Sequence, residues 1–349
     1  MAEVRKKKIL LLATGGTIAC VATDRGFVPG ITGRELLAQI PELAAEADFI
    51  AQQLMNKDSS EMEVQDWITI ASAVSIAQTA YDGVVITHGT DTMCYTAAAL
   101  SFMLRNLKIP VLLTGSQKPS TVEDSDGPDN LESACRFVLE AEPGVAIAFN
   151  RKLIHGVRAF KMYTKNKDAY VSRNYPVLAE LKDGQIVWHR QLKVLRDGPG
   201  LLPIEDPDKI FQEQTLDLCE NVGLLKLTPA TQADILNYYA NSSCRALVIE
   251  GFGAGGIANL TRGMAGGIKH LIDDCNISVV MISQCTYEGV NLSIYGVGEV
   301  AKGLGVIPGN DMTTEVAVTK LMWILSKTTD PVLIREMVQF NYLDEIAHD

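Results

Sequence analysis

The chain has 349 residues, enough for two domains, and 47% of them are hydrophobic, so each domain can bury a substantial core. Its formal net charge of −11 argues against a nucleic-acid partner, which requires clustered lysine and arginine. No apolar run approaches the roughly 18 residues of a membrane-spanning helix, so the sequence predicts no membrane partner.

The N-terminal segment places a basic stretch, residues 5–8, before an apolar run, residues 9–13. This combination resembles the start of a secretory signal. The run stops at Thr14, however, and is shorter than the roughly 7–15 apolar residues of an export signal. We interpret it as a buried strand and expect a cytoplasmic protein.

The cysteines and histidines carry no metal or disulfide pattern. Seven cysteines are scattered without a paired C-x-x-C spacing, and the five histidines lack the spacing of metal ligands. We therefore expect reduced thiols and no metal site. The glycine-rich stretch 251–256 does not fit a dinucleotide or phosphate motif, which disfavours a nucleotide site.

Two threonine boxes follow apolar runs that predict buried strands. Residues 13–19 read Ala-Thr-Gly-Gly-Thr-Ile-Ala, and residues 87–92 read Thr-His-Gly-Thr-Asp-Thr. The carboxyl ends of parallel strands line the crevice where ligands bind, so both loops can face one pocket. A threonine beside glycines suits a nucleophile, because glycine admits close approach by substrate. The pattern predicts a threonine-dependent amidohydrolase.

The pair Thr90-Asp91 has two interpretations. At the start of a helix, these residues can help bind an anionic group, and Asp91 can bind a substrate ammonium. The alternative is that both residues merely cap the helix. A second threonine box at another strand end favours the functional interpretation. In the same way, residues 58–62 form either a carboxylate-binding segment or an ordinary turn.

Short apolar runs alternate with helical patterns along the chain, which is typical of an α/β protein with a mostly parallel sheet. Helical spacing follows Asp66 as far as Ala77, and follows Asp91 as far as Leu107. Residues 111–113 and 145–148 predict strands, with a helix over 131–138 between them.

A stretch rich in glycine, proline and acidic residues begins near Arg196 and predicts an exposed connection between domains. We place an N-terminal catalytic domain at 1–195, a linker at 196–221 and a C-terminal α/β domain at 222–349. In the second domain the sequence predicts strands at 222–225, 246–249 and 279–282. Two final helices follow, at 318–325 and 333–338.

Together the motifs resemble the bacterial-type L-asparaginase family, most closely its cytoplasmic type I branch. The matching segments are spread over nearly the whole chain, at 14–19, 58–60, 88–92, 114–117, 126–128 and 309–313. The resemblance implies a larger N-terminal domain with a mostly parallel sheet and a smaller, flavodoxin-like C-terminal domain. It implies no metal or organic cofactor.

The resemblance also implies roles for particular residues. Thr17 matches the threonine that forms a covalent β-aspartyl intermediate, so the expected reaction converts L-asparagine to L-aspartate and ammonia. The family's second catalytic group, which orients water or assists proton transfer, corresponds to Thr90, Asp91 and Lys161. Its substrate-binding residues correspond to Asp58, Ser59 and Ser60, together with Thr90 and Asp91. An ammonium beside Thr90 and Asp91 would ease deprotonation and offset a partly buried charge.

Two departures from the family pattern stand out. Phe27 occupies the segment where many relatives have a tyrosine near the nucleophile, and we expect Tyr295 to supply the missing phenol. The allosteric asparagine site of some type I relatives has threonine and arginine where this chain has Phe160 and Glu250, although Cys285 is retained. Because a glutamate repels a carboxylate ligand, we expect no allosteric activation.

The family places its active site at a subunit junction, so we expect a homodimer or a dimer of dimers, with Gly256 and Asn259 in the junction region. An alternative is the ammonia-releasing subunit of a tRNA amidotransferase, which normally carries an added domain before its first threonine box. Only thirteen residues precede Thr14, which disfavours this alternative. A non-catalytic amino-acid-binding protein would need no nucleophile. The sequence leaves the acceptance of glutamine open.

Overall fold

The computed structural model describes residues 5–24, 26–201, 216–257 and 263–347. The described chain divides into two compact units, one holding the residues up to Leu195 together with Leu216, and the other holding Arg196 to Leu201 and the residues from Asp217 onward. Each unit contains a sheet and helices, in agreement with the alternating pattern of the sequence. Within the predicted linker, residues 202–215 lie outside the described ranges.

The first unit is built on a sheet that has eight strands among the described residues. Their spatial order is β12 (Gln185–Trp188), β11 (Ala179–Lys182), β8 (Lys152–His155), β7 (Gly144–Phe149), β6 (Pro110–Thr114), β5 (Gly83–Thr87), β1 (Lys7–Gly15) and β4 (Ala47–Lys57). The pairs from β4 to β7 are parallel, and those from β7 to β12 are antiparallel. The prediction of a mostly parallel sheet is confirmed.

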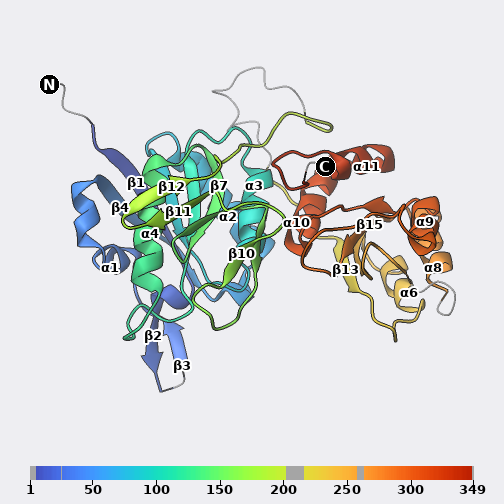
Figure 1. Ribbon diagram of the computed structural model, residues 1–349, viewed down its shortest axis with the longest axis horizontal. Coiled ribbons are helices and arrows are strands. Elements are labelled where there is room, and N and C mark those ends of the chain that lie inside the picture. Colours follow the sequence, from blue (N-terminus) through green and yellow to red (C-terminus); the bar gives the residue numbers. More distant parts are fainter. Residues whose placement is uncertain (1–4, 25, 202–215, 258–262, 348–349) are drawn as a thin grey trace. The chain divides into compact units, whose positions relative to one another are not determined.

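Helices cover both faces of this sheet (Figure 1). The remaining elements are α1 (Gly33–Leu37), α2 (Val64–Ala77), α3 (Met93–Met103), α4 (Gly127–Glu140), the hairpins β2 (Cys20–Thr23) with β3 (Gly26–Pro29) and β9 (Ala159–Lys161) with β10 (Tyr170–Ser172), and the 3₁₀ turns η1 (Thr17–Ala19), η2 (Pro41–Ala45) and η3 (Ser59–Glu61). Ile9 and Leu11 share a core with Leu131 and other residues of α4. Side chains alternate along a strand, so Leu10 and Leu12 point to the opposite face, where α2 and α3 pack together.

Helix α3 is shorter than its periodicity predicts. It ends at Met103, where Leu104 leaves the helical conformation with φ −89° and ψ 77°, and Asn106 follows with φ 56°. Leu104 and Leu107 are nevertheless buried. Their apolar spacing therefore reports burial beneath the turn into β6, and not further helix.

The strand order reverses direction beside β1. The chain goes from β1 to β4 on one side and then returns to β5 on the other, so the spatial order β4-β1-β5-β6-β7 is 2-1-3-4-5 in chain order. In open α/β sheets the crevice at such a reversal, outside the carboxyl ends of the strands, is where ligands bind. The threonine boxes follow β1 and β5, the two strands that flank this crevice.

The second unit contains a smaller parallel sheet. Its four described strands follow chain order, as β13 (Val222–Lys226), β14 (Ala246–Gly251), β15 (Ser278–Ser283) and β16 (Ile307–Pro308). The order of these four strands does not reverse, so they do not have the 2-1-3-4-5 strand order of a flavodoxin that the resemblance implies for this domain. That strand order is found instead in the first unit. The helices are α6 (Ile235–Ala240), α8 (Met264–Asp273), α9 (Gly296–Gly303), α10 (Thr314–Leu325) and α11 (Pro331–Gln339).

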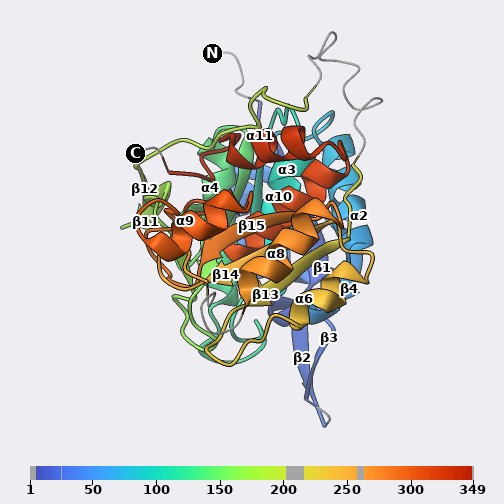
Figure 2. The same cartoon turned by 90° about the vertical axis from the view of Figure 1, so that its right-hand side faces the viewer.

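The helices of the second unit enclose its sheet. In Figure 2, α6, α8 and α9 lie in front of β13, β14 and β15. Leu236 of α6 and Ile268 of α8 share a core with Leu247 and Val279 of the strands. Helix α10 also contacts β13, β14 and β15, and α11 packs on α10.

The start of the predicted linker is packed against the C-terminal segment of this unit. The Tyr342 hydroxyl donates to the Pro199 carbonyl at 2.6 Å. A β-carbon at Gly198 would lie 2.5 Å from the Phe340 ring, so this glycine is required by close approach. Residues 198–199 are therefore half-buried, although their composition indicates an exposed connection.

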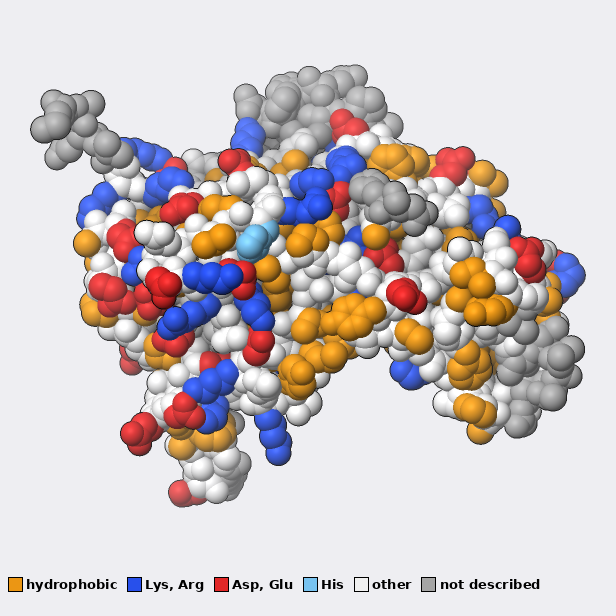
Figure 3. All heavy atoms as spheres, in the orientation of Figure 1, with side chains coloured by type: hydrophobic (Ala, Val, Ile, Leu, Met, Phe, Trp, Pro, Cys, Tyr) orange, Lys and Arg blue, Asp and Glu red, His pale blue; other side chains and the backbone are white. Residues whose placement is uncertain are grey.

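On the face shown in Figure 3, lysine and arginine side chains of the first unit lie beside aspartate and glutamate side chains. Over the described ranges, none of the helices has the length and apolar character needed to cross a membrane. The seven cysteines all fall in these ranges, and none of them forms a disulfide bond there.

Candidate active site

The loop after β1 turns sharply and packs against the loop after β5. Gly15 and Gly16 have φ 106° and 79°, and the Gly16 amide donates to the Lys57 carbonyl at 3.0 Å. A β-carbon at Gly16 would lie 2.3 Å from the Gly89 amide nitrogen, so only glycine fits. Thr17 and Thr90 each follow one member of this glycine contact, which brings the two threonine boxes together.

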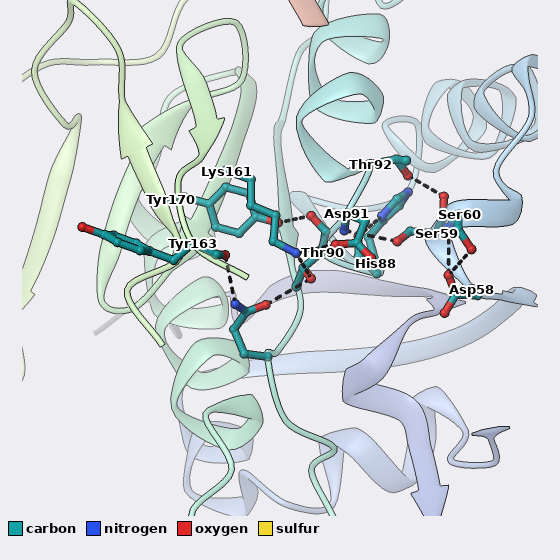
Figure 4. Close-up of polar contacts among 12 residues, drawn as sticks. Asp58, Ser59, Ser60, His88, Thr90, Asp91, Thr92, Lys161, Tyr163 and Tyr170 are labelled. Carbon is teal, nitrogen blue, oxygen red and sulfur yellow. Dashed lines mark hydrogen bonds and ion pairs between the residues drawn. The ribbon is translucent and has the colours of Figure 1, made fainter. Parts of the chain in front are cut away.

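Lys161 joins the second box from the end of β9. Its Nζ donates to Thr90 Oγ1 at 2.7 Å and forms an ion pair with Asp91 Oδ1 at 2.6 Å (Figure 4). The Lys161 side chain is 15% exposed, whereas that of Asp91 is 70% exposed. The cluster is therefore anchored at its lysine and open to solvent at its carboxylate.

The helix-capping interpretation of Thr90 and Asp91 does not fit this geometry. Helix α3 begins at Met93, and its N-cap is Thr92. Thr90 and Asp91 precede the cap, and both side chains contact Lys161.

Two further side chains hold Thr90. The Thr90 hydroxyl lies 3.2 Å from Gln117 Oε1, which accepts from it, and the Tyr170 hydroxyl donates to the Thr90 carbonyl at 2.5 Å. Burial raises the pKa of Tyr170 well above its usual value, so this phenol stays protonated and remains a donor. Gln117 lies in one of the segments that match the family, but the sequence assigns it no role. No sequence pattern distinguishes Tyr170.

The segment 58–60 forms its own turn beside the second box. Asp58 caps η3, and its Oδ1 accepts from the Ser60 amide at 2.8 Å and the Ser60 hydroxyl at 2.7 Å. Both bonds lower the pKa of Asp58 and keep it ionised, and the bond from the Ser60 hydroxyl has the larger effect. Ser59 Oγ accepts from the Asp91 amide at 3.2 Å, and the Ser59 carbonyl accepts from the Thr92 hydroxyl at 2.8 Å.

His88 lies behind Thr90 and is fully buried. Burial lowers its pKa to about 4, although the Gly89 carbonyl and the charge of Asp66 oppose the shift. His88 is therefore neutral near pH 7. The sequence places it in the second box without assigning it a role.

Comparison with known proteins places this geometry in a family. Residues 8–194 match the N-terminal asparaginase domain, and residues 221–338 match the glutaminase/asparaginase C-terminal domain. The chain belongs to the L-asparaginase family. The two matches together reach into every described strand of both sheets.

Individual relatives cover nearly the whole of this asparaginase-family chain. An L-asparaginase from Thermococcus kodakarensis is 38% identical over 97% of this chain and 99% of its own length. A solved structure of the thermostable L-asparaginase from that organism has a TM-score of 0.86 at 37% identity, covering 98% and 100% of the two chains. A probable cytoplasmic L-asparaginase from Campylobacter jejuni has a TM-score of 0.80 at 28% identity, covering 96% and 100%.

A second class of relative has a longer chain. A glutamyl-tRNA(Gln) amidotransferase subunit from Methanopyrus kandleri is 35% identical over 97% of this chain but only 74% of its own length. The family match therefore includes proteins named for two different reactions.

The residues that depart from the family pattern lie in both units. Phe27 is exposed on β3, and Tyr295 is the N-cap of α9 in the second unit, 64% exposed. Phe160 pairs with Val171 across the β9–β10 hairpin. The Glu250 carboxylate accepts from the Thr314 hydroxyl at 2.6 Å and pairs with Lys226 at 3.1 Å, and Cys285 is exposed. Asn259 lies outside the described residues.

Within the described ranges, no group of three or more histidine, cysteine, aspartate or glutamate side chains is arranged to hold a metal ion. The structure joins Thr90 and Asp91 of the second box to Lys161 of β9, and Thr17 follows the glycine of the first box that packs on Gly89.

Proposed function

We propose that this protein is an amidohydrolase that converts L-asparagine to L-aspartate and ammonia. The observation that carries the proposal is the Lys161–Thr90–Asp91 cluster, which lies where the strand order reverses, next to the loop that bears Thr17. The full-length similarity to an L-asparaginase from Thermococcus kodakarensis supports the same reaction.

The charges around the cluster suit the α-carbon groups of a free amino acid. Asp91 is largely exposed and keeps one carboxylate oxygen beyond its ion pair, which can accept from a substrate ammonium. Ser59 Oγ accepts from the Asp91 amide and keeps its own proton for a substrate carboxylate, whereas Ser60 donates its hydroxyl and its amide to Asp58 and would have to release one of them to bind the substrate. Asp58 fixes the Ser60 hydroxyl and orients the turn at residues 58–60.

In the proposed first step, Thr17 Oγ forms a bond to the side-chain carbonyl carbon of asparagine, and the carbon–nitrogen bond breaks. The hydroxyl proton is transferred to the departing nitrogen, which leaves as ammonia. In the second step, water attacks the threonine ester and releases aspartate. The Lys161 ammonium, 2.7 Å from Thr90 Oγ1, lowers the cost of removing a proton from that hydroxyl, so Thr90 can activate the water or assist the first transfer.

Tyr295 is the residue we propose as the phenol near the nucleophile, because Phe27 cannot relay a proton. Tyr295→Phe should then lower the turnover number, whereas Phe27→Tyr should leave Tyr295-dependent turnover in place. Unchanged turnover in Tyr295→Phe would remove Tyr295 from the mechanism.

Ammonia release from asparagine and from glutamine, measured side by side, tests the reaction. Thr17→Ala should reduce turnover by about 10³-fold or more, because it removes the nucleophile. Thr17→Ser keeps a hydroxyl and serves as the matched control, which should retain measurable turnover. An active Thr17→Ala variant would contradict the acyl-enzyme mechanism. The ratio of the two rates decides how far glutamine is accepted, since one methylene is worth about 1–3 kcal/mol.

A second candidate is favoured by the similarity to amidotransferase subunits. If this chain is such a subunit, the purified protein will release no ammonia from free asparagine or glutamine until a tRNA-bound partner complex is added. Turnover of free asparagine by the protein alone decides for the amidohydrolase.

We further propose a homodimer or dimer of dimers in the cytoplasm. Support for assembly comes from exposed aromatic side chains of the second unit, Tyr238, Tyr287 and Tyr295, which a partner subunit can cover. Support for the compartment comes from the similarity to the probable cytoplasmic L-asparaginase from Campylobacter jejuni. Light scattering across a concentration series tests the assembly, and a fully active monomer would contradict it.

A further inference from the structure

A chain of buried hydrogen bonds leads from helix α2 to the peptide that carries Thr90. Trp67 Nε1 donates to Thr96 Oγ1 at 2.9 Å, Thr96 Oγ1 lies 2.9 Å from His88 Nε2, and His88 Nδ1 lies 2.7 Å from the Gly89 carbonyl. Thr96 and His88 are fully buried, and Trp67 is nearly so. Figure 4 labels His88 together with Thr90 and Asp91, which follow it in the chain.

The chemistry of the partners fixes the direction of this chain. An indole N–H can only donate, so Thr96 accepts from Trp67 and its own proton is free for His88 Nε2. Nε2 is then the acceptor of a neutral imidazole, and the ring proton is on Nδ1. Nδ1–H donates in turn to the Gly89 carbonyl, which can only accept.

The position of the Gly89 carbonyl affects the groups around it. The peptide bond is planar, so fixing this oxygen also fixes the Thr90 amide that follows it. Gly89 is enclosed on both sides, because a β-carbon there would lie 2.6 Å from Ser59 Cβ, and the nucleophile loop packs on it through Gly16. The same peptide therefore contacts the nucleophile loop, the proposed substrate segment and the Lys161 cluster.

We propose that His88 is a positioning residue for the reaction, which receives its orientation from Trp67 and Thr96 and holds the Gly89–Thr90 peptide in register with Thr17 and Lys161. The inference rests on the proposed amide hydrolysis. It adds the three residues behind the site that keep Thr90 in place. It concerns the reactive geometry and not the binding of the substrate's α-carbon groups, which involve Asp91, Ser59 and Ser60.

Thr96→Val tests the proposal, because it replaces the hydroxyl with a methyl group of the same shape and interrupts the chain at its centre. We expect the kcat for asparagine to fall about tenfold, with KM within about twofold, since small errors in reactive geometry slow the chemical step. Thr96→Ser restores the hydroxyl and should return kcat to within about twofold of wild type.

Thr319→Val is the matched control for the loss of a buried threonine hydroxyl. Thr319 is fully buried on α10 in the second unit, where its hydroxyl bonds, in the contacts described, only to the Glu315 and Val316 carbonyls of its own helix. This variant should keep the wild-type kcat. A Thr96→Val enzyme with wild-type kcat, or one whose loss Thr96→Ser shares, would overturn the proposal.

A second measurement is independent of turnover. Selective ¹⁵N-histidine NMR of the wild-type protein at pH 7 should show one neutral, solvent-protected histidine with its proton on Nδ1, absent from a His88→Gln variant. A proton on Nε2 instead would overturn the chain of donors. If the wild-type protein hydrolyses no asparagine, the proposed function fails, and the NMR tautomer still decides whether the hydrogen-bond chain exists.

Discussion

Each unit of the molecule contains a lysine that pairs with a carboxylate, and the two pairs differ in how completely they are satisfied. Lys161 contacts Thr90 and Asp91, and the Asp91 side chain is 70% exposed. Lys320 and Glu345 are 1% and 0% exposed. The same two charges are therefore open to solvent in one unit and enclosed in the other.

In the enclosed pair, every Lys320 proton and both Glu345 oxygens have a hydrogen bond. Lys320 Nζ donates to the Val338 and Phe340 carbonyls at 2.9 and 2.7 Å and to Glu345 at 2.7 Å, which uses its three protons. Glu345 also accepts from the Tyr342 and Leu343 amides at 3.0 and 2.6 Å. The pair ties the C-terminal segment to α10 and leaves no capacity for a ligand.

The open pair has capacity left over. In the described contacts Lys161 uses two donors, and Asp91 keeps an oxygen beyond its bond to Lys161. An incompletely satisfied charge is costly in a core but useful at a crevice, because a substrate can complete it. Residual hydrogen-bonding capacity, and not the pairing of charges itself, therefore distinguishes the candidate site from the buried Lys320–Glu345 pair.

Lys320→Met tests the structural role of the buried Lys320–Glu345 pair. It should lower the free energy of unfolding by about 3–5 kcal/mol, because it leaves the Glu345 carboxylate buried without its cation. Denaturant unfolding measures the loss, and turnover per folded molecule should stay unchanged. Lys320→Met combined with Glu345→Gln should recover part of the stability, since no buried charge remains. A Lys320→Met variant as stable as wild type would show that the buried pair does not stabilise the second unit.

Lys161→Met should have the opposite profile. Turnover of asparagine should fall about 10²–10³-fold, equivalent to about 3–4 kcal/mol in the barrier, because Thr90 loses the neighbouring positive charge. The free energy of unfolding should change by less than about 1 kcal/mol, since the remaining Asp91 carboxylate is solvated. Steady-state kinetics and denaturant unfolding on the same preparation provide both values. A large loss of stability with normal turnover would assign Lys161 to structure.

His88, a fully buried histidine of the first unit, should make the fold sensitive to acid. Burial lowers the pKa of His88 from 6.5 to about 4, so the unfolded chain binds its proton more readily than the folded one. Stability is therefore lost as the pH falls from about 6.5 to 4, by about 3 kcal/mol in all.

The measurement is the free energy of unfolding at pH 7 and at pH 4, for wild type and for His88→Gln. The wild-type protein should lose more stability than the variant by roughly that amount. Equal losses in the two proteins would mean that His88 is not held neutral by its surroundings.

The smallest expected effect is the absence of activation by asparagine. By the resemblance to type I relatives, Glu250 is expected at the position of an anion-binding arginine, and its carboxylate is already engaged by Thr314 and Lys226. Rate against asparagine concentration should therefore be hyperbolic. A sigmoidal curve would show that a regulatory site exists despite the charge reversal.

Much of the fold can be predicted from local patterns. The apolar runs before the two boxes form β1 and β5, and the spacing of Trp67, Ile70, Val74 and Ala77 forms α2. These predictions hold because burial imposes a period on each strand and helix. The end of α3 is missed, because Leu104 and Leu107 continue the apolar spacing through a turn.

The residue types of the candidate site and the strand ends that carry them can be predicted from the sequence, because two glycine-flanked threonine boxes each follow an apolar run typical of a buried strand. Motif resemblance added Lys161. The contacts of Tyr170 and Gln117 with Thr90, and the hydrogen bonds that lead from Gly89 through His88 and Thr96 to Trp67, are seen in the three-dimensional structure and not in the sequence pattern. Apart from the bond between His88 and its neighbour Gly89, these contacts join residues that lie from 8 to 80 positions apart, and local periodicity has no term for partners at such separations.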